Sequence, residues 1–145
     1  MREYNVYLMN EEVAREYFGQ ESKLFQLFLE EMRCNEKNKE IVQKQISYIT
    51  QPIPALRLQK IFAQNLKNNL AYQSHEHSHY VNIAQGGQAE LAIFPSKLTL
   101  KVSGGFDTET VFFEMFRKLS PCFFAVDIHH YRYGWVNPIK QLKLI

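Results

Sequence analysis

The spacing of apolar residues changes near the middle of this chain of 145 residues. Before residue 68, apolar side chains mostly recur every three or four positions, which is the repeat of helices packed on a core. From residue 71 onward, short alternating stretches are separated by Gly-Gly and Pro-Ser pairs, which favours strands joined by turns. This order predicts an α+β or mixed α/β fold, in which helices of the N-terminal half pack on a mixed sheet drawn largely from the C-terminal half.

The same pattern gives the individual elements. A first strand is expected over residues 3–9, where β-formers alternate. Helices are expected between Asn10, as the cap, and Gly19, as the stop, and over residues 21–34, 35–50, 54–67 and 108–119. Further strands are expected within residues 71–84 and over 88–94, 97–103 and 122–128, with 131–137 an edge strand or structured loop and 139–145 a last strand or tail.

Composition limits the classes of protein that this chain can represent. One domain is expected over residues 1–145, because a chain of this length with 46% apolar residues can bury a core. A formal net charge of +2 predicts no strong affinity for nucleic acid or anionic membranes. Cys34 and Cys122 have no metal-type spacing, and no secretory signal or apolar run of ~20 residues is found. We therefore expect a cytoplasmic protein with reduced thiols.

Three histidines form the most obvious candidate metal site. His75, His77 and His79 recur at every second position, so on one strand they would line one face, ~6.8 Å apart. Imidazoles bind zinc, but strand-aligned triplets splay, and no cysteine or carboxylate stands at an evident ligand spacing on that face. The interpretation favoured here is a polar sheet edge, and no metal ion or cofactor is expected.

Two further functions remain as alternatives. The first is a small-molecule enzyme that uses Asp127 and His129 at the end of a strand, although no nucleophile elbow, phosphate-binding glycine loop or paired-carboxylate motif is present. We accordingly assign no catalytic residue. The second is a direct DNA-binding repressor, whose basic stripe would be Arg57, Lys60 and Lys67; this stripe lacks interleaved aromatic residues and is typical of a solvated helix face.

The short helix after Asn10 carries two apolar pairs, Val13 with Tyr17 and Ala14 with Phe18, about 100° apart around the helix axis. The second pair either widens the stripe that faces the core or faces a partner. The helix over residues 35–50 raises the same question. Its expected inward residues are Ile41, Val42, Ile46 and Ile49, while Gln45 and Tyr48 flank this set. Tyrosine at such a position suits an interface, although the edge of the core remains an alternative.

Four segments together resemble one protein family. They are EYFGQES at 16–22, QISYITQPIP at 45–54, ETVFFEMFRKLSPCFFAVD at 109–127 and YRYGWVNP at 131–138. Their order and spacing resemble those of the SirA family, the sporulation inhibitors of replication of endospore-forming bacteria. The segment 68–90, which contains the three histidines, resembles it poorly.

The resemblance implies a non-enzymatic regulator that binds the N-terminal domain of the replication initiator DnaA through apolar helical surfaces. It implies a monomer that forms a heterodimer with this domain and contacts neither nucleic acid nor membrane directly. Carried onto this sequence, the contact residues are Val13, Tyr17, Gln45 and Tyr48, with Pro138 as a weaker addition. Ala14 and Phe18 would then face the core.

Overall fold

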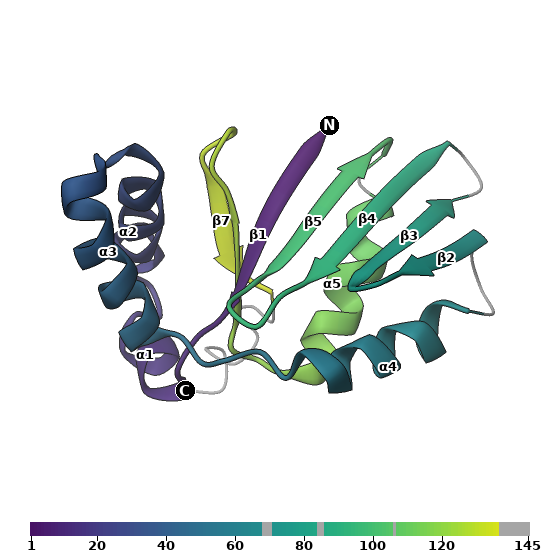
Figure 1. The fold of residues 1–145 in the computed structure, drawn as a ribbon, viewed down its shortest axis with the longest axis horizontal. Coiled ribbons are helices and arrows are strands. Elements are labelled where there is room, and N and C mark those ends of the chain that lie inside the picture. The colour runs from purple at the N-terminus through teal and green to yellow at the C-terminus, as the bar shows by residue number, and fades with distance from the viewer. Residues whose placement is uncertain (68–70, 84–85, 106, 137–145) are drawn as a thin grey trace.

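The computed structural model describes residues 1–67, 71–83, 86–105 and 107–136, without the side chains of residues 83 and 107. Its centre is a seven-stranded sheet in the order β2-β3-β4-β5-β1-β6-β7, in which every pairing is antiparallel (Figure 1). The strands are β1 (Arg2–Leu8), β2 (Ala71–His75), β3 (Ser78–Ile83), β4 (Gly87–Ile93), β5 (Leu98–Ser103), β6 (Phe123–Asp127) and β7 (Arg132–Trp135). The helices are α1 (Glu11–Glu16), α2 (Glu21–Arg33), α3 (Glu36–Ile49), α4 (Ala55–Leu66) and α5 (Asp107–Leu119).

This architecture confirms the predicted fold class and resolves it as α+β, with a sheet that is antiparallel throughout rather than mixed. Four helices come from the N-terminal half, and all strands but β1 come from the second half of the chain. The segment 131–137, left open as an edge strand or a loop, contains the edge strand β7. Residues 139–145 lie outside the described residues.

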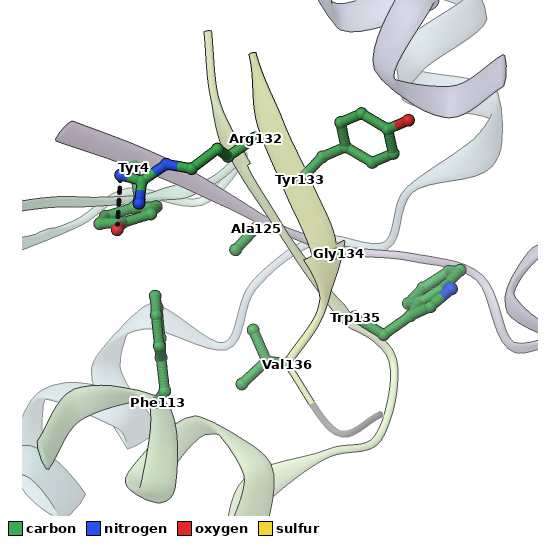
Figure 2. A pocket seen from close by; sticks show the side chains of 8 residues that line it. All are labelled: Tyr4, Phe113, Ala125, Arg132, Tyr133, Gly134, Trp135 and Val136. Carbon is green, nitrogen blue, oxygen red and sulfur yellow. Dashed lines mark hydrogen bonds between the residues drawn. The ribbon is translucent and has the colours of Figure 1, made fainter. Parts of the chain in front are cut away.

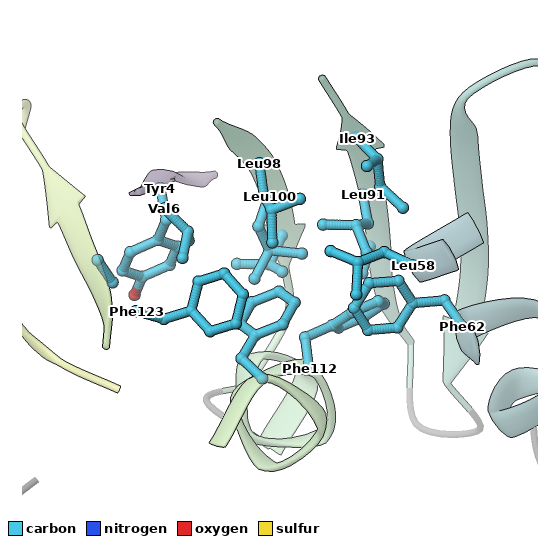
Figure 3. Packing of buried hydrophobic residues seen from close by; sticks show 14 of the residues in the cluster. Tyr4, Val6, Leu58, Phe62, Leu91, Ile93, Leu98, Leu100, Phe112 and Phe123 are labelled. Carbon is cyan, nitrogen blue, oxygen red and sulfur yellow. The ribbon is translucent and has the colours of Figure 1, made fainter. Parts of the chain in front are cut away.

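The larger core lies between the sheet and the helices α4 and α5. Figure 3 shows Phe62 of α4 and Phe112 of α5 pointing toward the leucines of β4 and β5. Phe62 and Phe112 are fully buried, as are Leu91, Leu98 and Leu100 of the sheet. Burying each such side chain stabilises the fold by roughly 1.5–3 kcal/mol, so this layer fixes β4 and β5 on the two helices.

The smaller core lies on the opposite face of the sheet, under α2 and α3, and it covers β1, β6 and β7 (Figure 1). Successive side chains of β6 point alternately to the two cores: Phe123 packs in the larger one and Phe124 in the smaller one. The continuous apolar run at 122–128 is explained by this position, since both faces of β6 are covered.

The histidine segment differs from the expectation. A turn at Glu76 and His77 divides residues 71–84 into the hairpin strands β2 and β3, and Glu76 has a φ of +54°. The three histidines therefore do not line one face of a single strand. His75 ends β2 and His77 lies in the turn, both exposed, whereas His79 of β3 is buried.

Candidate protein-docking surface

The short helix α1 begins at Asn10, but the side chain of this residue does not cap it. Asn10 has extended backbone angles, as an N-cap requires, yet the structure shows no side-chain capping bond there. Instead, its Nδ2 donates to the backbone carbonyl of Tyr48, 2.7 Å away at the end of α3. Gly19 has the left-handed φ, +86°, that its predicted role as the stop requires, but the helix ends earlier, at Glu16, with Tyr17 as its C-cap. The interpretation of the Asn10 amide as a helix cap was wrong.

Helix α3 presents one exposed row that contains Gln45 and Tyr48. Val42 and Ile46 are buried in the smaller core, as expected, but the Ile41 side chain is 58% exposed, so its inward assignment was wrong. Ile41 instead lies at i, i+4 and i+7 spacing with Gln45 and Tyr48 along one side of the helix. Tyr48 is 83% exposed. This row combines an aliphatic, an amide and a phenol side chain.

Helix α1 is shorter than predicted: it ends at Glu16, so Val13 and Ala14 lie in it, whereas Tyr17 is its C-cap and Phe18 follows in the turn. Val13 and Tyr17 are half-buried and pack against the smaller core, as Ile49 of α3 also does. Ala14 and Phe18 are also half-buried, and they line a cavity of about 280 Å³ against Cys122 and Trp135. Neither pair is fully buried, so Tyr17 keeps part of its surface accessible to another molecule.

Backbone hydrogen bonds connect the start of α1 and the end of β1 with the end of α3. Asn10 N donates to Ile49 O at 2.9 Å, and Gln51 N donates to Leu8 O at 2.7 Å. The side chain of Gln51 adds a bond from Nε2 to Met9 O at 2.8 Å. Figure 1 shows α1 beside the C-terminal end of α3, in agreement with these bonds. We call Val13, Tyr17, Ile41, Gln45 and Tyr48 the docking surface.

The remaining predicted contact residue, Pro138, lies outside the described residues. The preceding Trp135 is half-buried, with its ring 5.0 Å from that of Phe124 in a T-shaped arrangement. Its Nε1 donates to Glu21 Oε2 at 3.3 Å. Trp135 thus anchors β7 to α2.

Of the three histidines considered as a metal site, His79 makes buried contacts within the protein. His79 is 2% exposed, its Nδ1 lies 2.6 Å from Tyr72 Oη, and its Nε2 contacts the side-chain oxygen of Gln59. Burial lowers the pKa of His79. Because His79 joins α4 to the β2–β3 hairpin, its role in this arrangement is packing.

The predicted pair of Asp127 and His129 is not formed. Asp127 is fully buried at the end of β6 and accepts from Arg132 Nη2 at 2.7 Å and from His130 Nδ1 at 2.9 Å. Although burial raises the pKa of Asp127, the hydrogen bonds from Arg132 and His130 hold it below its usual value. His129 is exposed, and no hydrogen bond within the described residues joins it to Asp127. The geometry of the enzyme alternative was wrong.

A shallow pocket lies beside β7, next to this ion pair. Figure 2 shows the guanidinium of Arg132 above the ring of Tyr4, with Phe113 and Val136 on the apolar side of the pocket. The volume is about 230 Å³, whereas typical small-molecule sites enclose about 300–1,000 Å³. Burial, followed by the hydrogen bond to Glu109, raises the pKa of Tyr4 to about 12, so its phenol stays protonated. The docking surface is the stronger candidate.

The other two expectations from composition concern DNA and membranes. Arg57 and Lys60 of α4 and Lys67, its C-cap, are exposed. The large apolar residue exposed on the same helix is Leu56 rather than an aromatic one. Within the described ranges, no helix combines the length and the apolar character needed to cross a bilayer.

Comparisons with known proteins agree with the resemblance seen in the sequence. The family model described as "Sporulation inhibitor of replication protein SirA" matches residues 2–140. A Bacillus subtilis (strain 168) protein of the same name is 37% identical over 147 residues, which cover 99% of each chain.

Proposed function

Because the chain belongs to the SirA family of sporulation inhibitor of replication proteins, we propose that it restrains replication initiation by binding the N-terminal domain of DnaA in the cytoplasm of sporulating cells. The contact residues proposed are those of the docking surface, together with Pro138. The name of the relative describes an inhibitor of replication; the partner and the contact residues are our proposal.

The exposure of Tyr48 is the observation that carries this assignment. A tyrosine side chain that is 83% exposed in the free protein has a large apolar area still to bury. Tyrosine is also among the residues that dominate binding energy at protein interfaces. Ile41 and Gln45 extend the exposed row along α3, and we propose that the half-buried Tyr17, the C-cap of α1, adds to the same contact area.

The proposed mechanism is that the bound protein covers a surface of DnaA, and it needs no chemical step. A stable complex buries on the order of 1,200–2,000 Å² in total. Two short helices of a 145-residue protein provide one side of such an interface. An apolar helical face of DnaA covered in this way is no longer available for self-association or for other partners.

A binding titration with the isolated N-terminal domain of the cognate DnaA tests the proposal. Truncation of an interface hot spot costs ~1–3 kcal/mol, so Tyr48→Ala should weaken binding by roughly tenfold to a hundredfold. Tyr80→Ala is the matched control, because Tyr80 is an exposed tyrosine of β3, remote from α1 and α3. Equal affinities for wild type and Tyr48→Ala would exclude this surface, and a wild-type protein that does not bind would exclude the partner.

A further inference from the structure

One asparagine joins the two helices of the docking surface. The backbone carbonyl of Asn10 accepts the first hydrogen bond of α1, from Ala14 N at 2.9 Å. Its backbone N–H and its side-chain Nδ2 both point to the other helix, where they donate to Ile49 O at 2.9 Å and Tyr48 O at 2.7 Å. A single residue therefore contacts the first turn of α1 and the last turn of α3.

The two carbonyls that Asn10 reaches need partners from outside their helix. The last carbonyls of an α-helix have no donor within it, and those of Tyr48 and Ile49 are in the last turn of α3. Asparagine is among the best N-cap residues, yet its amide serves the end of α3 instead of the start of α1. The side chain of Asn10 thus links two helices that the chain separates by 19 residues or more.

We propose that Asn10 is a positioning residue of the docking surface: it holds the Tyr48 end of α3 against the first turn of α1 and so fixes Tyr48 relative to Tyr17. This inference rests on the proposed function, because the relative position of the two rings matters only if one partner covers both. When two anchors are already in place, binding does not have to order them, and the free energy of that ordering is not lost.

Asn10→Asp separates this role from helix capping. Aspartate is an equally good N-cap, and its charge is favourable at the start of α1. Its carboxylate, however, has no proton to donate to Tyr48 O, and its charge is unfavourable beside the carbonyl end of α3. Asn10→Ser is the uncharged counterpart: it also caps, but it is too short to reach Tyr48 O. Asn65→Asp, on the exposed side of α4, is the matched charge control.

The measurement is the dissociation constant for the DnaA N-terminal domain, with the full chain and its variants. The loss of one neutral hydrogen bond, ~0.5–1.5 kcal/mol, corresponds to binding that is about twofold to tenfold weaker. We expect this loss for Asn10→Asp and Asn10→Ser, with cooperative thermal unfolding retained, and no loss for Asn65→Asp. Wild-type affinity in both Asn10 variants would overturn the inference. If one Asn10 variant fails to unfold cooperatively, the dissociation constant of the other variant tests the inference.

The same variants in a Tyr48→Ala background distinguish positioning from a general structural role. If Asn10 acts by placing Tyr48, its substitution adds less than about twofold once Tyr48 is absent. An equal loss in both backgrounds would mean that Asn10 merely supports the fold, and the inference would be wrong. A Tyr48→Ala protein that binds as wild type would exclude the docking surface, and the inference with it, whereas a wild-type protein that does not bind the DnaA domain would refute the proposed function itself.

Discussion

The carboxylate of Glu109 in α5 accepts two hydrogen bonds from the guanidinium of Arg2 in β1, at 2.8 Å from Nε and 2.6 Å from Nη2. The two residues are 107 positions apart in the sequence. Glu109 is 3% exposed and also accepts from the Tyr4 hydroxyl. This contact joins the first strand to the last described helix.

Glu109→Ala should destabilise the protein strongly, because it leaves Arg2 and the Tyr4 hydroxyl without this acceptor. Because Glu109 is buried but Arg2 is partly exposed, the expected loss is ~1–3 kcal/mol. Urea unfolding measures this loss. Glu114→Ala, on the exposed side of the same helix, removes a pair with Arg117 and should change the unfolding free energy by less than ~1 kcal/mol. Similar losses of unfolding free energy in the two variants would contradict a stabilising contact of Glu109 with Arg2 and Tyr4.

The two tyrosines of the docking surface should differ in their effect on folding. Tyr48 is 83% exposed, so Tyr48→Ala should leave the unfolding free energy within ~0.5 kcal/mol of wild type. Tyr17 packs partly against the smaller core, so Tyr17→Ala should lower it by ~1–2 kcal/mol. Chemical denaturation of both variants tests this difference. A larger loss of unfolding free energy for Tyr48→Ala than for Tyr17→Ala would contradict the exposed position of Tyr48 and the half-buried position of Tyr17.

Ile41 should contribute to partner binding although the sequence placed it in the core. Ile41→Ala should leave the thermal stability nearly unchanged, since the side chain is 58% exposed, and should weaken binding of the DnaA domain by ~1 kcal/mol. Leu56→Ala is the control, because Leu56 is equally apolar and 83% exposed, but lies on α4 across the sheet. Unchanged affinity in Ile41→Ala would confine the docking surface on α3 to its last two turns.

Stability should fall as the pH is lowered from 7 to 5, and His79 should be one cause. Burial lowers the pKa of His79 in the folded protein below 6.5, its ordinary value. The unfolded chain therefore takes up this proton first, and acid favours unfolding. The unfolding free energy of His79→Gln should fall less over this interval than that of wild type. Parallel pH profiles for the two proteins would contradict this assignment.

Gly104 should tolerate no side chain, in contrast to its neighbour Gly105. Gly104 has a φ of +95°, and an added Cβ would lie 2.7 Å from Gly87 Cα, where β4 and β5 come together. Gly104→Ala should destabilise the fold by ~1–3 kcal/mol. An added Cβ at Gly105 meets no atom within 4 Å, so Gly105→Ala should be close to neutral. Equal melting temperatures of the two variants would refute this close approach.

The sequence predicted the elements where one local signal dominates. The helical repeat of α2 and α3, the prolines before α4 and the continuous apolar run of β6 all led to the observed elements. The hairpin turn at Glu76 and His77 was missed because it lacks the glycine or asparagine that usually marks such a turn. Strand periodicity therefore continued through it, and the histidines were placed on one face.

The candidate site was predicted less completely, because its details depend on contacts between distant segments. A helical wheel shows that Ile41 lies near the apolar arc of α3, but it does not show how wide a part of that arc α2 and the sheet cover. The amide of Asn10 is a cap by local rules, and its bond to a carbonyl 38 residues later has no local signal. For Gln45 and Tyr48 the sequence left two alternatives, an interface and the edge of the core, and the structure shows both side chains exposed.

The central position of β1 has a consequence for biosynthesis. Val6 of β1 pairs with Leu98 of β5 and with Ala125 of β6. The first strand that is synthesised therefore cannot form its pairings until β5 and β6 have also been synthesised. The helices α2 and α3 likewise belong to the smaller core, in which Phe28 of α2 stacks on Phe124 of β6. Such long sequence separations slow folding. In a nascent chain that still lacks β6, these helices have no sheet surface on which to pack. The docking surface should therefore form only after the ribosome has translated that strand.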